Sequence, residues 1–234
     1  MSTIFSVSEL LLRPIVFTRP MRLVEPTSWV PHIPFAFWLI DALRPRTVVE
    51  LGTHSGNSFS AFAQAVQILG LESACYAVDT WTGDEHAGRY GEEVFQEWSS
   101  FHDPHFGTFS RLVRSTFDDA LTKFKDGSID LLHIDGYHTY EAVRHDFESW
   151  LPKLSANAVV LLHDTNVREM DFGVWRLWQD LSHDYPCFAF LHGHGLGVVG
   201  VGRSLPPDVS TLVEHVAHQS PEAFAIRQFF GTLG

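Results

Sequence analysis

The apolar positions of the chain fall into short runs that alternate with amphipathic segments of helical spacing. Each run is five or six residues long and is bounded by glycine, proline or polar residues, which is typical of buried strands. We expect strands at residues 47–51, 74–78, 110–114, 129–134 and 158–162, separated or followed by helices at 58–69, 117–124, 139–154 and 174–181. Strands joined through helices of this length predict an α/β fold with a doubly wound, mostly parallel sheet.

The ends of the chain follow other patterns. Two further apolar runs, 187–191 and 196–201, flank a glycine-rich turn and predict a closing antiparallel hairpin. Prolines break the apolar residues before position 30, whereas 31–43 has helical spacing. We therefore divide the chain into an N-terminal arm and helix (1–46), a central domain (47–204) and a C-terminal helical extension (205–234), with helices near 207–218 and 222–230.

Residues 80–108 form a long aromatic insertion with a helix expected at 92–101. Long connections in compact domains are usually functional, so this insertion could line a ligand or cover a substrate as a lid. An ordinary packed excursion is the alternative, and the sequence does not decide between them.

Composition excludes several classes of protein. The 234 residues carry a net charge of −12 with no lysine or arginine cluster, which argues against a nucleic-acid partner. Two cysteines, Cys75 and Cys187, are too few for a disulfide framework. No apolar run is long enough to span a membrane, and the N-terminus lacks the pattern of a signal peptide. The sequence therefore indicates a soluble cytoplasmic protein.

A glycine loop, Glu50-Leu-Gly-Thr-His-Ser-Gly-Asn-Ser58, connects the first strand to its helix. Gly52 and Gly56 allow a tight turn and a close approach to a ligand, and the helix begins with unpaired N–H groups. Asp79 ends the next strand, where an acid is placed to accept hydrogen bonds from a ribose. The glycine spacing matches neither the dinucleotide fingerprint nor the P-loop, which disfavours NAD and ATP.

Strand ends carry the second set of candidates. Asp135 closes the fourth strand and Asp164 the fifth, so their carboxylates should converge at one sheet edge, and two carboxylates suit Mg²⁺. His138 lies three residues past Asp135, within reach of the same crevice. The alternatives are an Asp-Gly turn at Asp135, a helix-capping pair at Asp164-Thr165 and a solvated histidine.

These motifs, in this order, resemble the class I S-adenosylmethionine-dependent methyltransferases. Three segments look like those of one branch of this superfamily: Val78-Asp-Thr-Trp-x-Gly-Asp84, His133-Ile-Asp-Gly-x-His-x-Tyr-Glu141-x-Val143-x-x-Asp146 and His163-Asp-Thr165. That branch contains macrolide-sugar O-methyltransferases and cephalosporin-hydroxylase-type proteins, often beside glycosyltransferases. The resemblance covers about residues 47–201 and implies a Rossmann-like sheet of about seven strands with an antiparallel last strand.

The resemblance also implies roles for residues. S-adenosyl-L-methionine would be held by Glu50, Gly52, Thr53, Gly56, Ser58, Asp79, Thr80, Trp81 and Asp135. In the metal-dependent relatives, Mg²⁺ is held at the positions of Asp135, Asp164 and Thr165, and a histidine at the position of His138 is the base. Thr165 stands where those relatives carry an acid or amide, which leaves the use of a metal open.

The sequence therefore predicts O-methylation of a sugar or glycosylated small molecule, with His138 and Asp135 as catalytic residues. Two alternatives remain: a hydroxylase-like oxidoreductase of the same family, and a non-catalytic module that binds a nucleoside or a partner glycosyltransferase. The sequence leaves open the identity of the acceptor, the oligomeric state (a homo-oligomer through the apolar arm is one option), and the role of His192 and His194.

Overall fold

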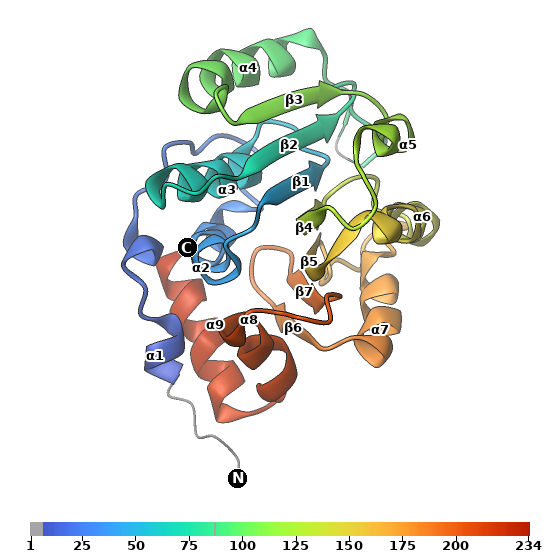
Figure 1. The fold of residues 1–234 in the computed structure, drawn as a ribbon. Coiled ribbons are helices and arrows are strands. Elements are labelled where there is room, and N and C mark those ends of the chain that lie inside the picture. The colour runs from blue at the N-terminus through green and yellow to red at the C-terminus, as the bar shows by residue number, and fades with distance from the viewer. Residues whose placement is uncertain (1–6, 87) are drawn as a thin grey trace.

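A single mixed sheet organises the protein. The computed structural model describes residues 7–86 and 88–234, so residues 1–6 of the predicted arm and residue 87 of the insertion lie outside the description. Seven strands lie in the order β3-β2-β1-β4-β5-β7-β6 (Figure 1). They are β1 (Thr47–Leu51), β2 (Ala74–Asp79), β3 (Ser110–Arg114), β4 (Ile129–Ile134), β5 (Leu154–His163), β6 (Cys187–Phe190) and β7 (Leu196–Gly200). The predicted seven-stranded, mostly parallel sheet is confirmed.

The order of the strands locates a crevice. β1 pairs in parallel with β2 on one side and with β4 on the other, so the chain reverses its winding direction between β1 and β4. β5 continues the parallel sheet, and β7 pairs with it antiparallel, as the predicted hairpin required. Ligands of open α/β sheets bind beyond the carboxyl ends of the strands at such a switch point.

The helices differ from the sequence prediction mainly at their ends. The predicted helix at 139–154 ends at Trp150, because Pro152 interrupts it, and β5 then begins at Leu154. The segment near 207–218 forms two short helical turns that end at His215 instead of one long helix. The helices are α1 (Val7–Leu11), α2 (Ile33–Leu43), α3 (Asn57–Ile68), α4 (Glu92–Phe106), α5 (Phe117–Ala120), α6 (Tyr140–Trp150), α7 (Val174–Asp184), α8 (Pro207–Ser210) and α9 (Pro221–Leu233).

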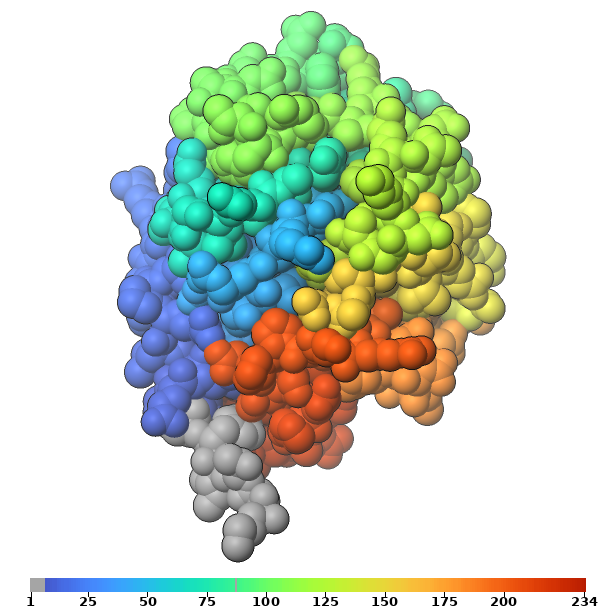
Figure 2. Space-filling view, viewed as in Figure 1, coloured from blue at the N-terminus to red at the C-terminus, as the bar shows by residue number. Residues whose placement is uncertain are grey.

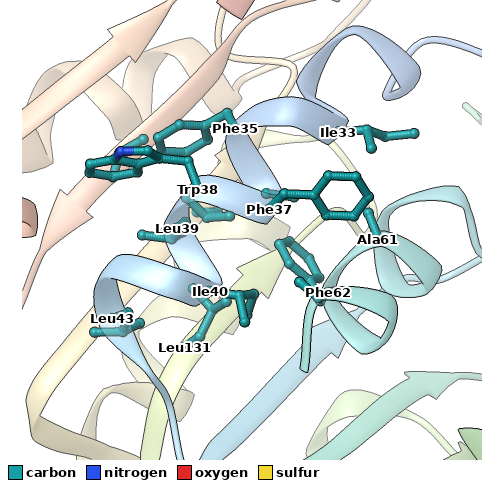
Figure 3. Close-up of a cluster of buried hydrophobic side chains, with 14 of the residues drawn as sticks. Ile33, Phe35, Phe37, Trp38, Leu39, Ile40, Leu43, Ala61, Phe62 and Leu131 are labelled. Carbon is teal, nitrogen blue, oxygen red and sulfur yellow. The ribbon is translucent and has the colours of Figure 1, made fainter. Parts of the chain in front are cut away.

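Two apolar clusters cover the two faces of the sheet. One joins α2, α3 and α9 to the sheet, and the other packs α6 and α7 on the opposite face. α2 is almost entirely buried, so it forms a central layer and not a surface helix. Figure 3 shows Phe37 and Ile40 of α2 directed toward Phe62 of α3, with Leu131 of β4 beside Ile40.

The described part of the N-terminal arm and the C-terminal helices pack together beside α2. The arm, in blue, and the C-terminal helices, in red, lie next to each other at the end of the molecule opposite α4 (Figures 1 and 2). Buried residues of the arm, such as Ile15, belong to the same cluster as Phe230 of α9. None of the helices in the described part of the chain is both long and apolar enough to cross a membrane.

Truncation of one ring in this central layer tests the packing. Phe62 is fully buried, so Phe62→Ala should lower the free energy of unfolding by about 3–5 kcal/mol. Phe224 is 65% exposed on α9, so Phe224→Ala is the matched control and should change stability by less than about 0.5 kcal/mol. Chemical denaturation measures both, and equal effects of the two substitutions would contradict this description of the core.

Candidate active site

The glycine loop lies directly against the end of β4. The N–H of Gly52 donates to the carbonyl of Val78 (2.9 Å), and the N–H of Asp135 donates to the carbonyl of Leu51 (2.8 Å). Gly52 has a φ of +86°, and a Cβ at this position would overlap the carbonyl oxygen of Asp135. Only glycine therefore allows the loop and the end of β4 to approach so closely.

Asp79 fixes the other side of the loop. Its Oδ2 accepts hydrogen bonds from the N–H groups of Thr53 and His54, both at 2.9 Å, and its Oδ1 accepts one from the N–H of Trp81 at 2.7 Å. The hydroxyl of Tyr90 also bonds to this carboxylate, which adds to the burial that raises the pKa of Tyr90. The carboxylate of Asp79 thus shapes the loop by binding the backbone N–H groups of the loop. That Asp79 also accepts hydrogen bonds from a ribose stays a prediction.

A cavity of about 250 Å³ opens between the ends of β1, β2 and β4. We call it the β2-side cavity. Its wall is formed by Gly52, His54, Asp79, Thr80, Gly83, Asp84, Tyr90, Thr116, Phe117, Asp135, Gly136, Tyr137 and His138.

A second cavity, of about 340 Å³, lies toward β5, and we call it the β5-side cavity. It is lined by Pro26, Ser28, Gly52, Thr53, His54, His86, Asp135, His138, His163, Asp164, Val167, Glu169, Met170, Phe172 and His194. Gly52, His54, Asp135 and His138 line both cavities, so the two spaces meet at these residues.

Imidazoles surround the two carboxylates at this junction. His138 Nε2 lies 2.9 Å from Asp164 Oδ2 and 3.6 Å from Asp135 Oδ1. His163 Nδ1 lies 3.2 Å from Asp135 Oδ1, and His194 Nδ1 lies 3.2 Å from Asp164 Oδ1. Asp135, His138 and Asp164 each offer one ligand atom within 4.8 Å of the others, so they could hold a metal ion. The predicted convergence of the two strand ends is present in the fold.

The charges at the junction stabilise one another. Burial disfavours ionisation of Asp135 and Asp164, but the neighbouring histidines overcome it and hold the pKa of both carboxyls below the usual range. Burial also disfavours a charged His138, yet hydrogen bonds to Asp135 and Asp164 raise its pKa to about 9. The same carboxylates raise the pKa of His163, whose Nε2–H donates to the carbonyl of Gly193 at 2.9 Å.

Other predicted residues lie behind the cavities. Glu50 is fully buried and accepts a hydrogen bond from His133 Nδ1 at 2.8 Å, while burial raises the pKa of Glu50. Ser58 is buried in the first turn of α3, and Gly56 packs against Trp98 of α4. Glu50, Gly56 and Ser58 are not among the described residues that line either cavity. These residues would contribute to ligand binding by supporting the glycine loop.

The side chain of Thr165 packs against the hairpin of β6 and β7. Its hydroxyl lies next to Gly195, just before β7, and its methyl group lies next to Gly197 of β7, the strand that neighbours β5. Thr165 does not line the β5-side cavity, in contrast to Asp164 immediately before it. The structure therefore brings together Asp135, His138 and Asp164, but not the side chain of Thr165.

Several residues that line the site were not singled out from the sequence. His86 from the insertion is packed between Tyr137 and Phe172, and its Nε2 bonds to Asp171 at 2.6 Å. His54 has a φ of +48°, and its pKa is lowered by burial. The histidine-rich composition was the available signal for such residues in the sequence, but only the fold shows which histidines line the same cavity.

Solved structures share this fold at low sequence identity. A methyltransferase from Geobacter sulfurreducens aligns over 74% of this chain and 80% of its own, with a TM-score of 0.57 and 18% identity. A Staphylococcus aureus protein provisionally assigned as a caffeoyl-CoA O-methyltransferase aligns over 76% and 85%, with a TM-score of 0.57 and 15% identity. The methyltransferase PaMTH1 of Podospora anserina, solved with S-adenosylhomocysteine, aligns over 72% and 77%, with a TM-score of 0.55 and 14% identity.

Two curated relatives bear the name uncharacterized protein. Protein y4gI of Sinorhizobium fredii is 46% identical over 205 residues, which is 88% of this chain but 22% of that protein. Protein R132 of Acanthamoeba polyphaga mimivirus is 26% identical over 124 residues, 50% of this chain and 51% of that protein. The chain thus spans about a fifth and about half of the lengths of these relatives.

A family model described as a methyltransferase domain matches residues 49–165, which is half of the chain and contains the glycine loop, Asp79, Asp135 and Asp164. The chain belongs to this family of methyltransferase domains.

Proposed function

We propose that the protein is an S-adenosylmethionine-dependent O-methyltransferase. The observation that supports this proposal most directly is the meeting of two cavities at Gly52, His54, Asp135 and His138. Methyl transfer is an in-line displacement at a sulfonium methyl group, so it needs a cofactor site and an acceptor site with a common boundary. The β2-side cavity would hold the cofactor, and the β5-side cavity the acceptor.

The β2-side cavity suits a cationic nucleoside. Asp79, Asp84 and Asp135 contribute carboxylates to its wall, whereas no lysine or arginine is among its described lining residues. Such a wall favours the positive sulfonium over an anionic cofactor. Phe117, which follows β3, offers an aromatic ring for a base. The Podospora structure with bound S-adenosylhomocysteine is consistent with this proposal.

The β5-side cavity supports an uncharged hydroxyl acceptor. It combines five histidines and three acids with a few apolar side chains, and its described lining contains no lysine or arginine. The phosphates of a coenzyme A ester would find no lysine or arginine in this wall, and its charged imidazoles, His138 and His163, are already paired with carboxylates. This argues against an acceptor of the kind named for the Staphylococcus aureus protein. A sugar or a glycosylated small molecule, which is rich in hydroxyl donors, fits the many acceptor atoms of the wall.

His138 is the group that we propose as the base. It lines both cavities, so it lies where an acceptor hydroxyl would face the methyl group. Its pKa of about 9 means that the imidazole is protonated at neutral pH and becomes a proton acceptor as the pH rises. Asp135 and Asp164 hold the ring in position, so each also determines how strongly His138 keeps its proton.

A divalent cation fits between the same two carboxylates. Asp135 and Asp164 are hard oxygen ligands, and substrate oxygens or water would complete the octahedron that Mg²⁺ prefers. Such an ion would lower the pKa of an acceptor hydroxyl. The position of Thr165 offers the cation no third oxygen ligand from the protein, so this proposal limits the protein ligands to the two carboxylates and leaves His138 as the base.

The partners follow from the same reasoning. We propose a saccharide acceptor. Because the matched segment is only 22% of y4gI, we also propose a domain that works beside others such as a glycosyltransferase. A homo-oligomer through the apolar arm is a further proposal, supported by the exposed side chains of Phe17 and Leu23.

The glycine loop gives a test of the cofactor site. Gly52→Ala would force a Cβ against the carbonyl of Asp135, so it should weaken S-adenosylhomocysteine binding at least about tenfold, a loss of about 1.4 kcal/mol. Gly70→Ala is the matched control, because Gly70 also has a positive φ but faces open space. Calorimetry measures both, and no binding to the unmodified protein at submillimolar cofactor would reject the proposed function.

The role of His138 is tested by its pH profile. His138→Gln should reduce methyl transfer to methyl glycosides by roughly 10²–10⁴-fold and leave cofactor affinity within about twofold. In the unmodified protein the rate should rise from pH 7 through about 9, as the imidazole loses its proton. Unchanged turnover in the variant would reject the base, and cofactor binding without transfer to any glycoside would favour a binding module.

Removal of metal tests the two-carboxylate site. EDTA should lower the rate of methyl transfer and Mg²⁺ should restore it, whereas Asp164→Asn should lose most of this response. Because a bound cation opposes the pull of the carboxylates on the His138 proton, the pH profile should move to lower pH with Mg²⁺. Transfer that is indifferent to EDTA would rule against the cation.

A further inference from the structure

The N-terminal arm follows the glycine loop and α3 through paired hydrogen bonds. Gln64 of α3 donates from Nε2 to the carbonyl of Arg19 and accepts at Oε1 from the N–H of Met21, both at 2.9 Å. The amide of Gln64 is buried by this pairing, with 3% of the residue exposed. The side chain therefore pairs with the backbone of the arm much as a neighbouring strand would.

Asn57 repeats this arrangement at the start of α3. Its Oδ1 accepts from the N–H of Val24 at 3.1 Å, and its Nδ2 donates to the carbonyls of Val24 at 2.7 Å and Pro26 at 2.9 Å. Asn57 directly follows Gly56 of the glycine loop. The second pairing thus holds the arm at the point where the loop becomes a helix.

Arg22 lies between these two pairings and contacts the loop itself. Its Nε donates to the carbonyl of Ser55 at 2.7 Å, and Nη2 bonds to Glu97 of α4 at 2.6 Å. The guanidinium lies over the ring of Trp98, 5.0 Å from its centroid. Among the described residues, Arg22 is the one lysine or arginine that is buried. A buried charge is costly unless it is paired, and here the partners include a carbonyl of the glycine loop.

The loop needs such support because its backbone is unusual. Gly52, His54 and Gly56 have φ angles of +86°, +48° and +84°. A left-handed non-glycine residue such as His54 persists only when its surroundings hold it. Asp79 holds the loop from one side, while Arg22 and Trp98 hold it from the other, since Gly56 packs on the indole that Arg22 covers.

We propose that the arm segment 19–26 positions the glycine loop, with Arg22 as the positioning residue. Docking of the arm on this loop and binding of the cofactor then favour each other. The inference rests on the proposed cofactor site. If the docked arm raises affinity for the cofactor, then by thermodynamic reciprocity the cofactor must stabilise the docked arm by the same factor. The segment ends at Pro26, which lines the β5-side cavity together with Ser28, so the arm also forms part of the wall of that cavity.

The sequence provides a specific probe of arm docking. Trypsin does not cleave before proline, and Arg13 and Arg19 both precede prolines, so Arg22–Leu23 is the only tryptic bond in residues 1–30. Because the side chain of Arg22 is 4% exposed, cleavage requires the arm to leave the loop, and its rate reports the undocked fraction. Arg203–Ser204 lies in an exposed turn after β7 and is the reference bond.

Saturating S-adenosylhomocysteine should slow cleavage at Arg22–Leu23 at least about fivefold and change cleavage at Arg203–Ser204 less than about twofold. This experiment uses the unmodified chain, so it does not depend on a variant that folds. Equal rates at Arg22 with and without the ligand would overturn the proposal, as would equal slowing at both bonds.

Calorimetry supplies the reciprocal measurement. Arg22→Met should weaken S-adenosylhomocysteine binding at least about fivefold in the folded protein. Arg13→Met is the matched control, because Arg13 is also an arm residue that pairs with acids, Asp41 and Asp208, and lies over an indole, that of Trp38. Arg13→Met should lower the melting temperature but keep the affinity for S-adenosylhomocysteine within about twofold of that of the unmodified protein.

The outcomes separate this inference from the proposed function. No binding of S-adenosylhomocysteine to the unmodified protein rejects the methyltransferase proposal and the coupling with it. Binding that is unaffected by Arg22→Met, with only a lower melting temperature, rejects the coupling alone and leaves Arg22 as a packing residue. Selective protection of the Arg22–Leu23 bond together with a selective loss of affinity supports the coupling.

Discussion

The structure depends on one close backbone contact, that of Gly52 with the carbonyl of Asp135. β1 and β4 are parallel neighbours, and the chain winds away from them in opposite directions, so their ends leave a crevice that helices do not fill. The missing side chain at Gly52 allows the glycine loop to lie against Asp135 across this crevice. The same contact forms the boundary between the two cavities, so it determines where a methyl donor and its acceptor would meet.

Around this contact the protein compensates acids with histidines. Lysine and arginine are absent from the described lining of both cavities, so Asp135 and Asp164 depend on the imidazoles of His138, His163 and His194. Because the carbonyl of Gly193 can only accept, His163 Nε2 carries a proton, and the carboxylates favour a second proton on Nδ1. A site balanced in this way admits cationic and neutral ligands more readily than anions.

The sequence was sufficient for the sheet because its strands are short apolar runs with clear ends. It also predicted which acids close β4 and β5, since the carboxyl ends of parallel strands share one edge. It did not reveal that His54, His86 and His194 line one cavity, because these histidines come from three separate loops and have no common spacing. Nor did it show that Thr165 turns toward Gly195 and Gly197, since that depends on the pairing of β5 with the hairpin. The contacts of Arg22 were equally hidden, because the arm has no periodic pattern.

In the proposed reaction, the junction of the cavities would link acid–base chemistry to cation binding. A proton on His138 and a cation between Asp135 and Asp164 would neutralise the same negative charge, so each would weaken the binding of the other. Without a cation, the carboxylates raise the pKa of His138 to about 9 and make it a weak proton acceptor at neutral pH. If a cation neutralised them, the burial that lowers the pKa of His138 would act unopposed, and the imidazole would be free to accept a proton from an acceptor hydroxyl. The same two carboxylates would therefore restrain the proposed base in the absence of a cation and release it in its presence.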